Sequence, residues 1–276
     1  MLSSQPRASA FSFVMLLAGS FFVLFPFWVM ITTSLLPPEG LGDPAQALWP
    51  RELSWQNYPR MLQKAPVFQY FINSLIVSII TTIGHTFLCA MAAYAFSRLK
   101  FKGKNLAFFI FLITLMVPPQ VNIVPLFFIM KTLHWLDTYW ALIVPGLFGA
   151  FGVFLLRQWF NTLPRALEDA AKMDGCSPWQ TFFYIALPLA KPALATLAIF
   201  VFISSWNSFM WPLLATNSEE MRTLPVGIAT LKSSYRDVVD WPILMAAAFF
   251  SVLPVVVVFL AAQRQFLKGV FSGSIK

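Results

Sequence analysis

The polar segment 163–188 holds the most specific residue pattern of this sequence. Its first part, 163–175, predicts a helix, because polar residues recur at intervals of three and four on one helical face, at Arg165, Glu168, Asp169 and Lys172. Apolar residues at 163, 166, 167, 170 and 171 are expected to cover the opposite face. Pro164 suits the first turn of this helix, and Gly175 suits a left-handed stop at its end.

A second helix is predicted directly after Gly175. Ser177 and Gln180 have the spacing of a capping box, in which each side chain bonds the other residue's backbone amide, and Pro178 fits the first helical position. Pro188 is expected to end this helix, because proline has no backbone N–H. The two helices form a compact knob that suits docking into the groove of a partner. The alternative is a helix pair that covers the rest of its own chain.

The sequence contains no residue set with the spacing of a catalytic or metal site. It has no GxxxxGK[ST] loop to cradle ATP, no HExxH pair, no Ser/His/acid set and no His/Cys/Asp/Glu cluster with metal-ligand spacing. We therefore predict a chain that is not an enzyme and that binds no metal and no cofactor itself. If this chain drives transport, the energy for transport must come from another chain.

The composition indicates a chain embedded in a membrane. Apolar residues make up 58% of the 276 residues, charged residues make up 11%, and the mean hydropathy is +0.72, whereas a soluble protein has about 25% charged residues. Six charge-free runs are long enough to cross a bilayer core, at 8–38, 65–97, 105–130, 138–156, 192–218 and 241–263. Because these runs are continuously apolar, they predict helices rather than the strands of a barrel. We expect an all-α membrane protein with six transmembrane helices.

The charges of the connecting segments predict the orientation in the membrane. The N-terminus, 98–104, 157–191 and 264–276 together hold twelve of the 19 basic residues but only three of the eleven acidic residues. Basic segments mark the cytoplasmic side, so both termini and segment 163–188 are predicted to be cytoplasmic. The net charge of +8 is divided among short separate loops, which argues against nucleic-acid binding.

Polar residues inside the predicted spans suggest a path for a polar solute. Gln120 and Asn122 follow the Pro118-Pro119 pair, which predicts either a broken helix that lines a solute path or an ordinary kinked helix packed among its neighbours. Trp206 and Asn207 lie among serines in the fifth run. The alternative is that these groups only join neighbouring helices by hydrogen bonds. The six runs contain no Asp, Glu, Lys or Arg, which disfavours proton- or sodium-coupled transport and suits a neutral solute.

The spacing within 163–188 resembles the EAA loop of ABC-importer permeases, the membrane-spanning subunits of these importers. Asp169-Ala170-Ala171 is followed after three residues by Gly175, and Ile185-Ala186-Leu187-Pro188 follows after nine more. Asp169 replaces the usual Glu, which keeps the charge and shortens the side chain by one methylene. The resemblance implies a cytoplasmic EAA coupling loop at 159–188. The ATPase-docking residues that it implies are Asp169, Ala170, Ala171, Asp174, Gly175, Ile185, Leu187 and Pro188.

Four other segments are similar to the carbohydrate branch of this family, and there to the smaller permease of the maltose-type and glycerol-phosphate-type importers. These segments are 206–213, 223–227, 240–247 and 263–269. The resemblance implies the type I ABC-importer permease fold, in a single transmembrane permease domain over 1–276.

The resemblance also implies a function and a set of partners. This chain would form half of the translocation path for a sugar or sugar-like solute, in the cell (inner) membrane of a bacterium or archaeon. A second, homologous but non-identical permease would form the other half. Two ABC ATPase subunits, which use ATP and Mg²⁺, would dock at the EAA loops, and an extracellular binding protein would deliver the solute. Gln120, Asn122, Trp206 and Asn207 are then candidates to border the path.

Two other functions stay open. An ABC permease for glycerol phosphate, a polyamine or an amino acid would share the EAA loop, although 206–213 and 263–269 favour the carbohydrate branch. A stand-alone facilitator or channel would transport its solute without an ATPase and would have no use for a docking knob at 163–188.

Overall fold

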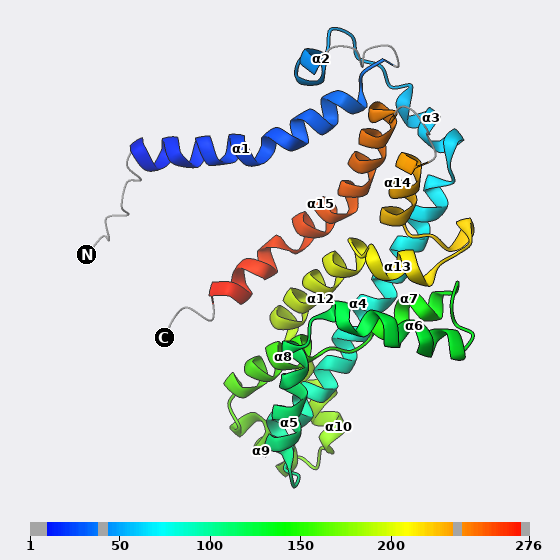
Figure 1. The fold of residues 1–276 in the computed structure, drawn as a ribbon. Coiled ribbons are helices and arrows are strands. Elements are labelled where there is room, and N and C mark those ends of the chain that lie inside the picture. Colours follow the sequence, from blue (N-terminus) through cyan, green and yellow to red (C-terminus); the bar gives the residue numbers. More distant parts are fainter. Residues whose placement is uncertain (1–9, 38–43, 234–238, 272–276) are drawn as a thin grey trace. The chain divides into compact units, whose positions relative to one another are not determined.

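The described part of the chain is helical throughout. The computed structural model describes residues 10–37, 44–233 and 239–271, and these ranges contain helices, turns and bends but no strand (Figure 1). The all-α class predicted from the sequence is confirmed.

Three single helices are long and apolar enough to cross a membrane. They are α1 (Ala10–Ser34), α4 (Val67–Arg98) and α15 (Trp241–Phe271). They correspond to the first, second and sixth charge-free runs of the sequence. Pro26 in α1 and Pro254 in α15 lie inside their helices without ending them.

Three further spans are pairs of helices joined by a sharp bend. The third run forms α5 (Lys104–Ile113) and η2 (Thr114–Met116), followed after a 93° bend by η3 (Pro119–Asn122) and α6 (Ile123–Thr132). The fourth forms α7 (Tyr139–Ile143) and η4 (Val144–Gly146), followed after a 40° bend by α8 (Ala150–Thr162). The fifth run covers α12 (Lys191–Trp206) and the short α13 (Met210–Ala215). The bent pair of this span is α12 together with the helical segment Pro178–Leu189 that precedes it, at 77°. With α1, α4 and α15, these elements account for the six predicted spans.

The break in the third span follows from its two prolines. Val117, which precedes Pro118, has ψ of 116°, and Pro118 itself has ψ of 132°, so both residues leave the helical region. A residue before proline is driven out of the α region by a clash with the proline ring. Of the two alternatives for Pro118-Pro119, a broken helix or a simple kink, the structure therefore shows the broken helix.

Contacts divide the described residues into two compact units, which are described separately. The first unit takes its residues from 1–67 and 228–252, and the second from 68–227 and 253–276. Three helices, α4, α14 (Leu224–Ser233) and α15, contribute to both units.

Buried polar contacts hold the first unit together. Asn57, at the start of α3 (Asn57–Lys64), is fully buried and donates its side-chain amide to the carbonyls of Ser34 and Leu36, at 2.9 and 2.7 Å. Arg60 and Lys64 of α3 form ion pairs with Asp240, which directly precedes α15, at 3.1 and 2.9 Å. These contacts join α3 to the end of α1 and to the start of α15.

The core of the second unit lies where α4 packs against α8 and the helices that follow residue 177. Its fully buried members include Ala90, Ala93, Val153 and Leu156, and the ring of Tyr94 contacts the rings of Phe160 and Phe182 at 5.7 and 5.2 Å between centroids. Both cysteines, Cys89 and Cys176, are free.

Candidate functional site

The segment predicted to dock a partner begins with α9 (Ala166–Met173) and the turn that ends it. Gly175 has φ of +81°, the left-handed conformation predicted for it. Its amide donates to the carbonyl of Lys172 at 3.0 Å, and the amide of Cys176 donates to that of Ala171 at 2.9 Å. This bond pair is a Schellman motif, which satisfies carbonyls that a helix end otherwise leaves unpaired.

The second helix of the segment also begins as predicted. The Ser177 hydroxyl accepts from the Gln180 amide at 3.3 Å, and the Gln180 side chain accepts from the Ser177 amide at 2.8 Å, which completes the capping box at the start of α10 (Pro178–Thr181).

The predicted helix end at Pro188 is wrong. The chain continues from α10 through a π-helical turn, η5 (Phe182–Ala186), into α11 (Leu187–Leu189), so Pro188 lies inside helical structure. A proline inside a helix leaves the carbonyl four residues earlier, here that of Tyr184, without its usual partner. The π-helical turn η5 includes Tyr184, whose carbonyl is the one left without a partner. The helix bends after Leu189, where Pro178–Leu189 and Lys191–Trp206 meet at 77°.

The predicted burial of α9 is also wrong. Ala166, Leu167 and Ala170, placed on the inner face by the sequence pattern, are exposed, and of the expected inner residues of this helix only Ala171 is buried. Glu168 points inward instead. Asp169 and Lys172 do face outward, with 72% and 70% of their side chains exposed, and they form an ion pair at 3.6 Å.

Glu168 turns inward because a buried cation lies there. Arg98, the last residue of α4, has Nε at 3.2 Å from the Glu168 carboxylate, with 5% and 15% of the two side chains exposed. Its Nη2 also donates to the carbonyl of Leu163 at 2.6 Å and to that of Phe160. Arg98 therefore joins the end of α4 to the end of α8 and to α9. A charge this buried is tolerated only when it is paired and hydrogen-bonded.

The predicted docking residues divide into exposed and inward-facing ones. Asp169 and Ala170 on α9, Asp174 and Gly175 in the turn after it, and Pro188 in α11 are exposed. Ala171 is buried, and Ile185 and Leu187 are half-buried. Large apolar side chains that the sequence analysis did not single out extend this surface, namely Met173, Trp179 and Tyr184, of which Met173 is 88% exposed. These three residues could have been recognised in the sequence, because each is a large apolar residue within a polar segment.

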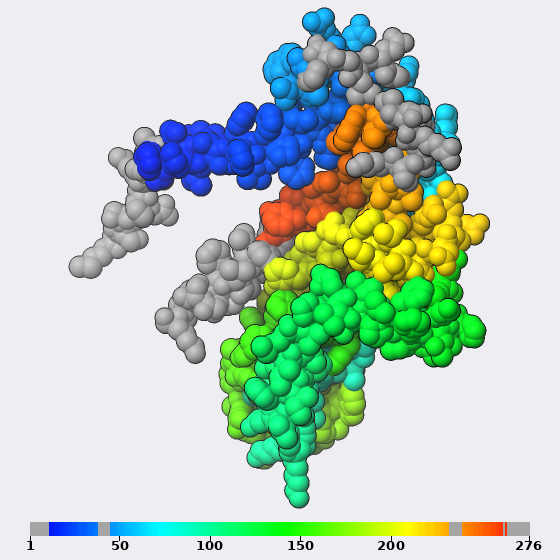
Figure 2. All heavy atoms as spheres, viewed as in Figure 1, coloured from blue at the N-terminus to red at the C-terminus, as the bar shows by residue number. Residues whose placement is uncertain are grey.

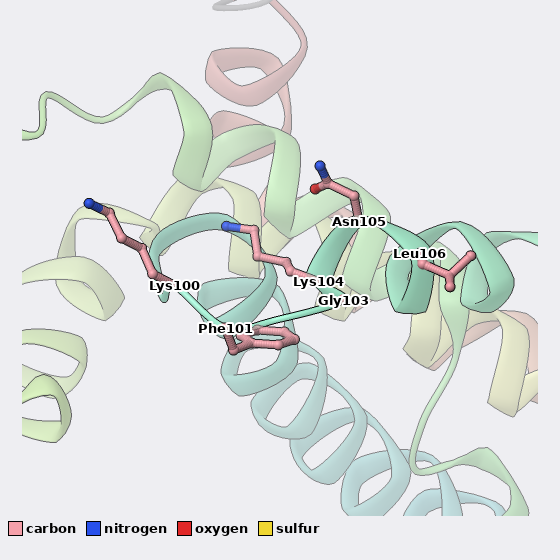
Figure 3. Close-up of a pocket in the computed structure, with 6 residues that line it drawn as sticks. All are labelled: Lys100, Phe101, Gly103, Lys104, Asn105 and Leu106. Atoms are coloured by element: carbon pink, nitrogen blue, oxygen red, sulfur yellow. The ribbon is translucent and has the colours of Figure 1, made fainter.

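A basic hollow lies at the same end of the second unit. The loop from α4 to α5 forms a protruding tip near α9 and α10 (Figures 1 and 2). Lys100, Phe101, Gly103 and Lys104 line a hollow of about 390 Å³ there, and both ammonium groups extend to the same side of the loop (Figure 3). The Lys104 ammonium donates to the carbonyls of Ser97 and Leu99, at 3.2 and 3.0 Å, and so caps the end of α4.

A larger cavity, of about 820 Å³, lies among the bent spans of the second unit. Its walls come from α4, from both sides of the break at Pro118-Pro119, from the bend between η4 and α8, and from α12 and α13. None of the described residues that line it is an Asp, Glu, Lys or Arg. The polar side chains in its walls are Ser74, Thr81, His85, Thr114, Asn122, Ser204, Ser205, Ser208 and Thr223. Aromatic side chains also contribute, namely Phe148, Phe151, Phe200 and Trp211.

Of the residues predicted to border a solute path, Asn122 lies in the wall of this cavity. Gln120 lies in the same helix, η3, and is exposed, but is not among the lining residues. Trp206 is 1% exposed and packs against the rings of Phe71 and Phe202, at 5.5 and 5.8 Å between centroids. It therefore belongs to the packed interior and does not line the cavity.

Asn207 has a structural contact at the end of α12. Its side-chain amide donates to the carbonyl of Ile203 at 2.9 Å, and the residue does not line the cavity. The serines beside it, Ser204, Ser205 and Ser208, do. The sequence analysis therefore identified the polar cluster around Asn207 correctly. It chose Trp206 and Asn207 as the path residues, whereas the serines of the cluster line the cavity.

Close packing of α4 against the bend of the fourth span shapes one wall. His85 Nδ1 lies 2.7 Å from the carbonyl of Gly146. A Cβ atom at Gly152 would lie 2.9 Å from both His85 Nε2 and Cys89 Sγ, so only glycine fits this approach. His85 thus has a packing role, and its hydrogen bond helps to hold the bend.

Comparison with known proteins decides the family. A family model described as "Binding-protein-dependent transport system inner membrane component" matches residues 86–271. The chain belongs to this family. The resemblance drawn from the EAA-like segment is thereby confirmed, and the chain is a multi-pass permease subunit of a transport system.

Two curated relatives match the permease from end to end. The arabinooligosaccharides transport system permease protein AraQ of Bacillus subtilis (strain 168) is 36% identical over 284 residues, which cover 100% of each chain. The sn-glycerol-3-phosphate transport system permease protein UgpE of Yersinia enterocolitica is 33% identical, over 98% of each chain.

A solved structure has the same fold as the permease. It is a chain of a bacterial ABC transporter involved in the import of the acidic polysaccharide alginate, with a TM-score of 0.85 over 95% of this chain and 100% of that chain, at 23% identity. The type I importer fold expected from the sequence is thereby supported in three dimensions.

The segment between α13 and α14 of the permease is tied down by polar contacts. Asp137 Oδ1 accepts from the backbone amides of Asn217 and Ser218 at 2.9 and 3.0 Å, and also from the Ser218 hydroxyl. Burial raises the pKa of Asp137, but these hydrogen bonds and the charge of Arg222 outweigh it and hold the pKa below its usual value. Asn73 adds two bonds, to the carbonyls of Glu220 and Arg222 at 2.6 and 2.9 Å.

Proposed function

We propose that this chain forms one half of the translocation path of an ATP-driven importer, and that the solute is a neutral carbohydrate. The observation that carries the proposal is the cavity of about 820 Å³, whose walls combine hydroxyl and amide groups with aromatic faces and contain no charged side chain. A sugar presents hydroxyl groups at its edges and apolar C–H groups on its faces, and such a lining suits both.

The proposed energy source is a pair of ABC ATPase subunits. This chain has no ATP-binding loop, so ATP and Mg²⁺ would be used by those partners and not here. The exposed surface of α9, with Asp169, Ala170 and the projecting Met173, is the proposed docking site. Asp169 would face a basic residue of the ATPase, while the apolar side chains fill its groove.

The remaining proposed partners complete the path and deliver the solute. A second, homologous and non-identical permease would close the open side of the cavity, and an extracellular binding protein would release solute into it. One similar solved structure, at a TM-score of 0.64, is of an alginate ABC transporter in complex with an alginate pentasaccharide-bound periplasmic protein. We propose the bacterial inner membrane as the location, with the EAA loop at 159–188 on the cytoplasmic side and one permease domain over 1–276.

The names of the two relatives suggest two candidate classes of solute for this chain, arabino-oligosaccharides and sn-glycerol 3-phosphate. A phosphate group carries nearly two negative charges at neutral pH and requires cationic or multiple amide partners. Since the cavity of this chain has no cation in its described walls, the neutral oligosaccharide is favoured.

The test is transport by the assembled complex in liposomes. We expect uptake of a short arabino-oligosaccharide that requires ATP, the ATPase subunits and the binding protein, and little uptake of glycerol 3-phosphate, polyamines or amino acids. Uptake that persists without the ATPase subunits would identify a facilitator instead. Efficient uptake of glycerol 3-phosphate alone would reject the carbohydrate assignment but keep the importer.

A further inference from the structure

Four hydroxyl groups in the middle of α4 differ from most other threonine hydroxyls of the described residues. Eight of the described threonines donate their hydroxyl to a backbone carbonyl three or four residues earlier, namely Thr32, Thr114, Thr132, Thr138, Thr162, Thr181, Thr196 and Thr216. Such back-bonding is the usual way to satisfy a hydroxyl on a helix in an apolar environment. On α4, by contrast, the hydroxyls of Ser78, Thr81, Thr82 and Thr86 are buried and have no hydrogen-bond partner within the chain.

Thr81 is the member of this group that lines the cavity. It lies close to the middle of α4, which spans Val67–Arg98, and it is 5% exposed. Its methyl group faces Gly146, where a Cβ atom would lie 2.9 Å from Cγ2 but 3.9 Å from the hydroxyl oxygen. The packing at Gly146 therefore involves the methyl group and leaves the hydroxyl without a partner near the midpoint of the span.

Thr223 is a second unpartnered hydroxyl in the same wall. It is 4% exposed and directly precedes α14, far from Thr81 in the sequence. The neighbouring Ser74 also lines the cavity, but its hydroxyl already accepts from the amide of Leu224 at 2.8 Å. Two separate elements thus bring buried hydroxyls without a partner in the chain to one uncharged cavity.

We infer that the hydroxyls of Thr81 and Thr223 bind hydroxyl groups of the carbohydrate as it passes, so that this permease itself contacts the solute and helps to select it. A buried hydroxyl without a partner is unfavourable, and almost all such groups in folded proteins are bonded to protein, water or ligand. A hydroxyl can donate and accept at once, which matches the donor–acceptor character of each sugar hydroxyl. This inference rests on the proposed function, since it requires the solute to enter this cavity.

The experiment replaces each hydroxyl by a methyl group of similar shape. Thr81→Val and Thr223→Val are compared with Thr81→Ser, which keeps the hydroxyl, and with Thr82→Val and Thr86→Val. The two control threonines lie on the same helix and have equally unpartnered hydroxyls, but they do not line the cavity. Complex yield and thermal melting are measured for every variant.

The readout is the amount of arabinotriose taken up per ATP hydrolysed by the complete complex with its binding protein. Losing one solute hydrogen bond is expected to lower this ratio about 5- to 10-fold in Thr81→Val and Thr223→Val, while Thr81→Ser and both controls stay within about twofold of wild type. The yield and melting of all variants should remain close to wild type.

Two results would overturn the inference. The first is wild-type coupling in both Thr81→Val and Thr223→Val, and the second is an equal loss in the Thr82→Val and Thr86→Val controls, which would mean that α4 hydroxyls act in packing. If the wild-type complex itself takes up no arabinotriose with ATP, the proposed function fails for this solute class, and the inference fails with it. The wild-type measurement therefore distinguishes the two failures.

Discussion

The guanidinium of Arg98 at the end of α4 lies 3.2 Å from the carboxylate of Glu168 in α9, in surroundings where neither side chain is more than 15% exposed. Arg98 also holds the carbonyls of Phe160 and Leu163, at the end of α8. The proposed docking helix is thus attached to two spans by one cation. Movement of α9 that an ATPase imposes would be transmitted through this ion pair to α4, whose middle lies in the cavity wall.

Removing the charge of Glu168 should loosen this attachment. Glu168→Gln leaves the Arg98 cation buried without a counter-charge, and breaking a buried pair in this way costs roughly 3–5 kcal/mol. We expect a lower melting temperature of the purified complex and weaker co-purification of the ATPase. Asp169→Asn is the matched control, because that carboxylate is 72% exposed and should affect stability by less than about 1 kcal/mol. Equal melting of the two variants would contradict the assignment.

Gly175 is required for its backbone conformation and not for lack of space. A Cβ atom there would meet nothing within 4 Å, yet φ is +81°. Gly175→Val should therefore cost roughly 1–3 kcal/mol through backbone strain and reduce ATPase stimulation by the loaded binding protein. Gly175→Asn should retain most of the stimulation, since Asn tolerates this conformation best among residues with a side chain. Loss of stimulation in both variants to the same degree would mean that side-chain volume matters instead.

Gly227 is required for space. A Cβ atom at this position would overlap the ring of Tyr70, so Gly227→Ala must displace that fully buried ring. We expect a loss of roughly 1–3 kcal/mol by overpacking, measured as a lower melting temperature. Gly19→Ala, at a helical position where nothing lies within 4 Å, should be neutral or stabilising by up to about 1 kcal/mol. Equal destabilisation in both variants would rule out the Tyr70 contact as the cause.

The stability of the complex should depend on Trp206 and not on Asn207. Trp206→Ala removes a ring that packs against Phe71 and Phe202, and creating such a cavity costs roughly 3–5 kcal/mol. Complex yield and melting temperature should therefore fall together. Asn207→Ala removes only a bond to the carbonyl of Ile203 at an exposed position, so melting should change little. If the Trp206→Ala complex melts like wild type but transports poorly, Trp206 borders the solute path and its assignment to the packed interior is wrong.

The contacts of Asp137 predict a dependence on acid pH. Its folded-state pKa lies below the ordinary value of 3.8, so its contribution to stability is fully present above that value and is lost as the pH falls through the folded-state pKa. We expect the segment around Asn217 and Ser218 to open earlier on acidification than the core, measured by hydrogen exchange of those two amides. Asp137→Asn should show faster exchange already at neutral pH, and unchanged exchange in this variant would contradict the role of the carboxylate.

Much of this permease follows from local sequence. The Schellman turn at Gly175, the capping box at Ser177 and Gln180, and the break at Pro118-Pro119 were all predictable. Each depends on sterics and hydrogen bonds among residues within a few positions of one another. The six spans follow from the spacing of charges, because a bilayer excludes charge and unpaired backbone wherever the chain crosses it.

Only the tertiary structure decided which way the polar side chains face. The pattern of 163–175 placed Glu168 outside, but Arg98, seventy residues earlier in the chain, provides a buried counter-charge and turns the helix toward it. Trp206 lies within a polar cluster of the sequence, yet Phe71 from another span buries it. Thr81 and Thr223 carry no signal in the sequence, since a threonine in an apolar helix is usually satisfied by its own backbone. Thr81 and Thr223 can act on one solute only because the fold brings both hydroxyls, from separate elements, to the wall of one cavity.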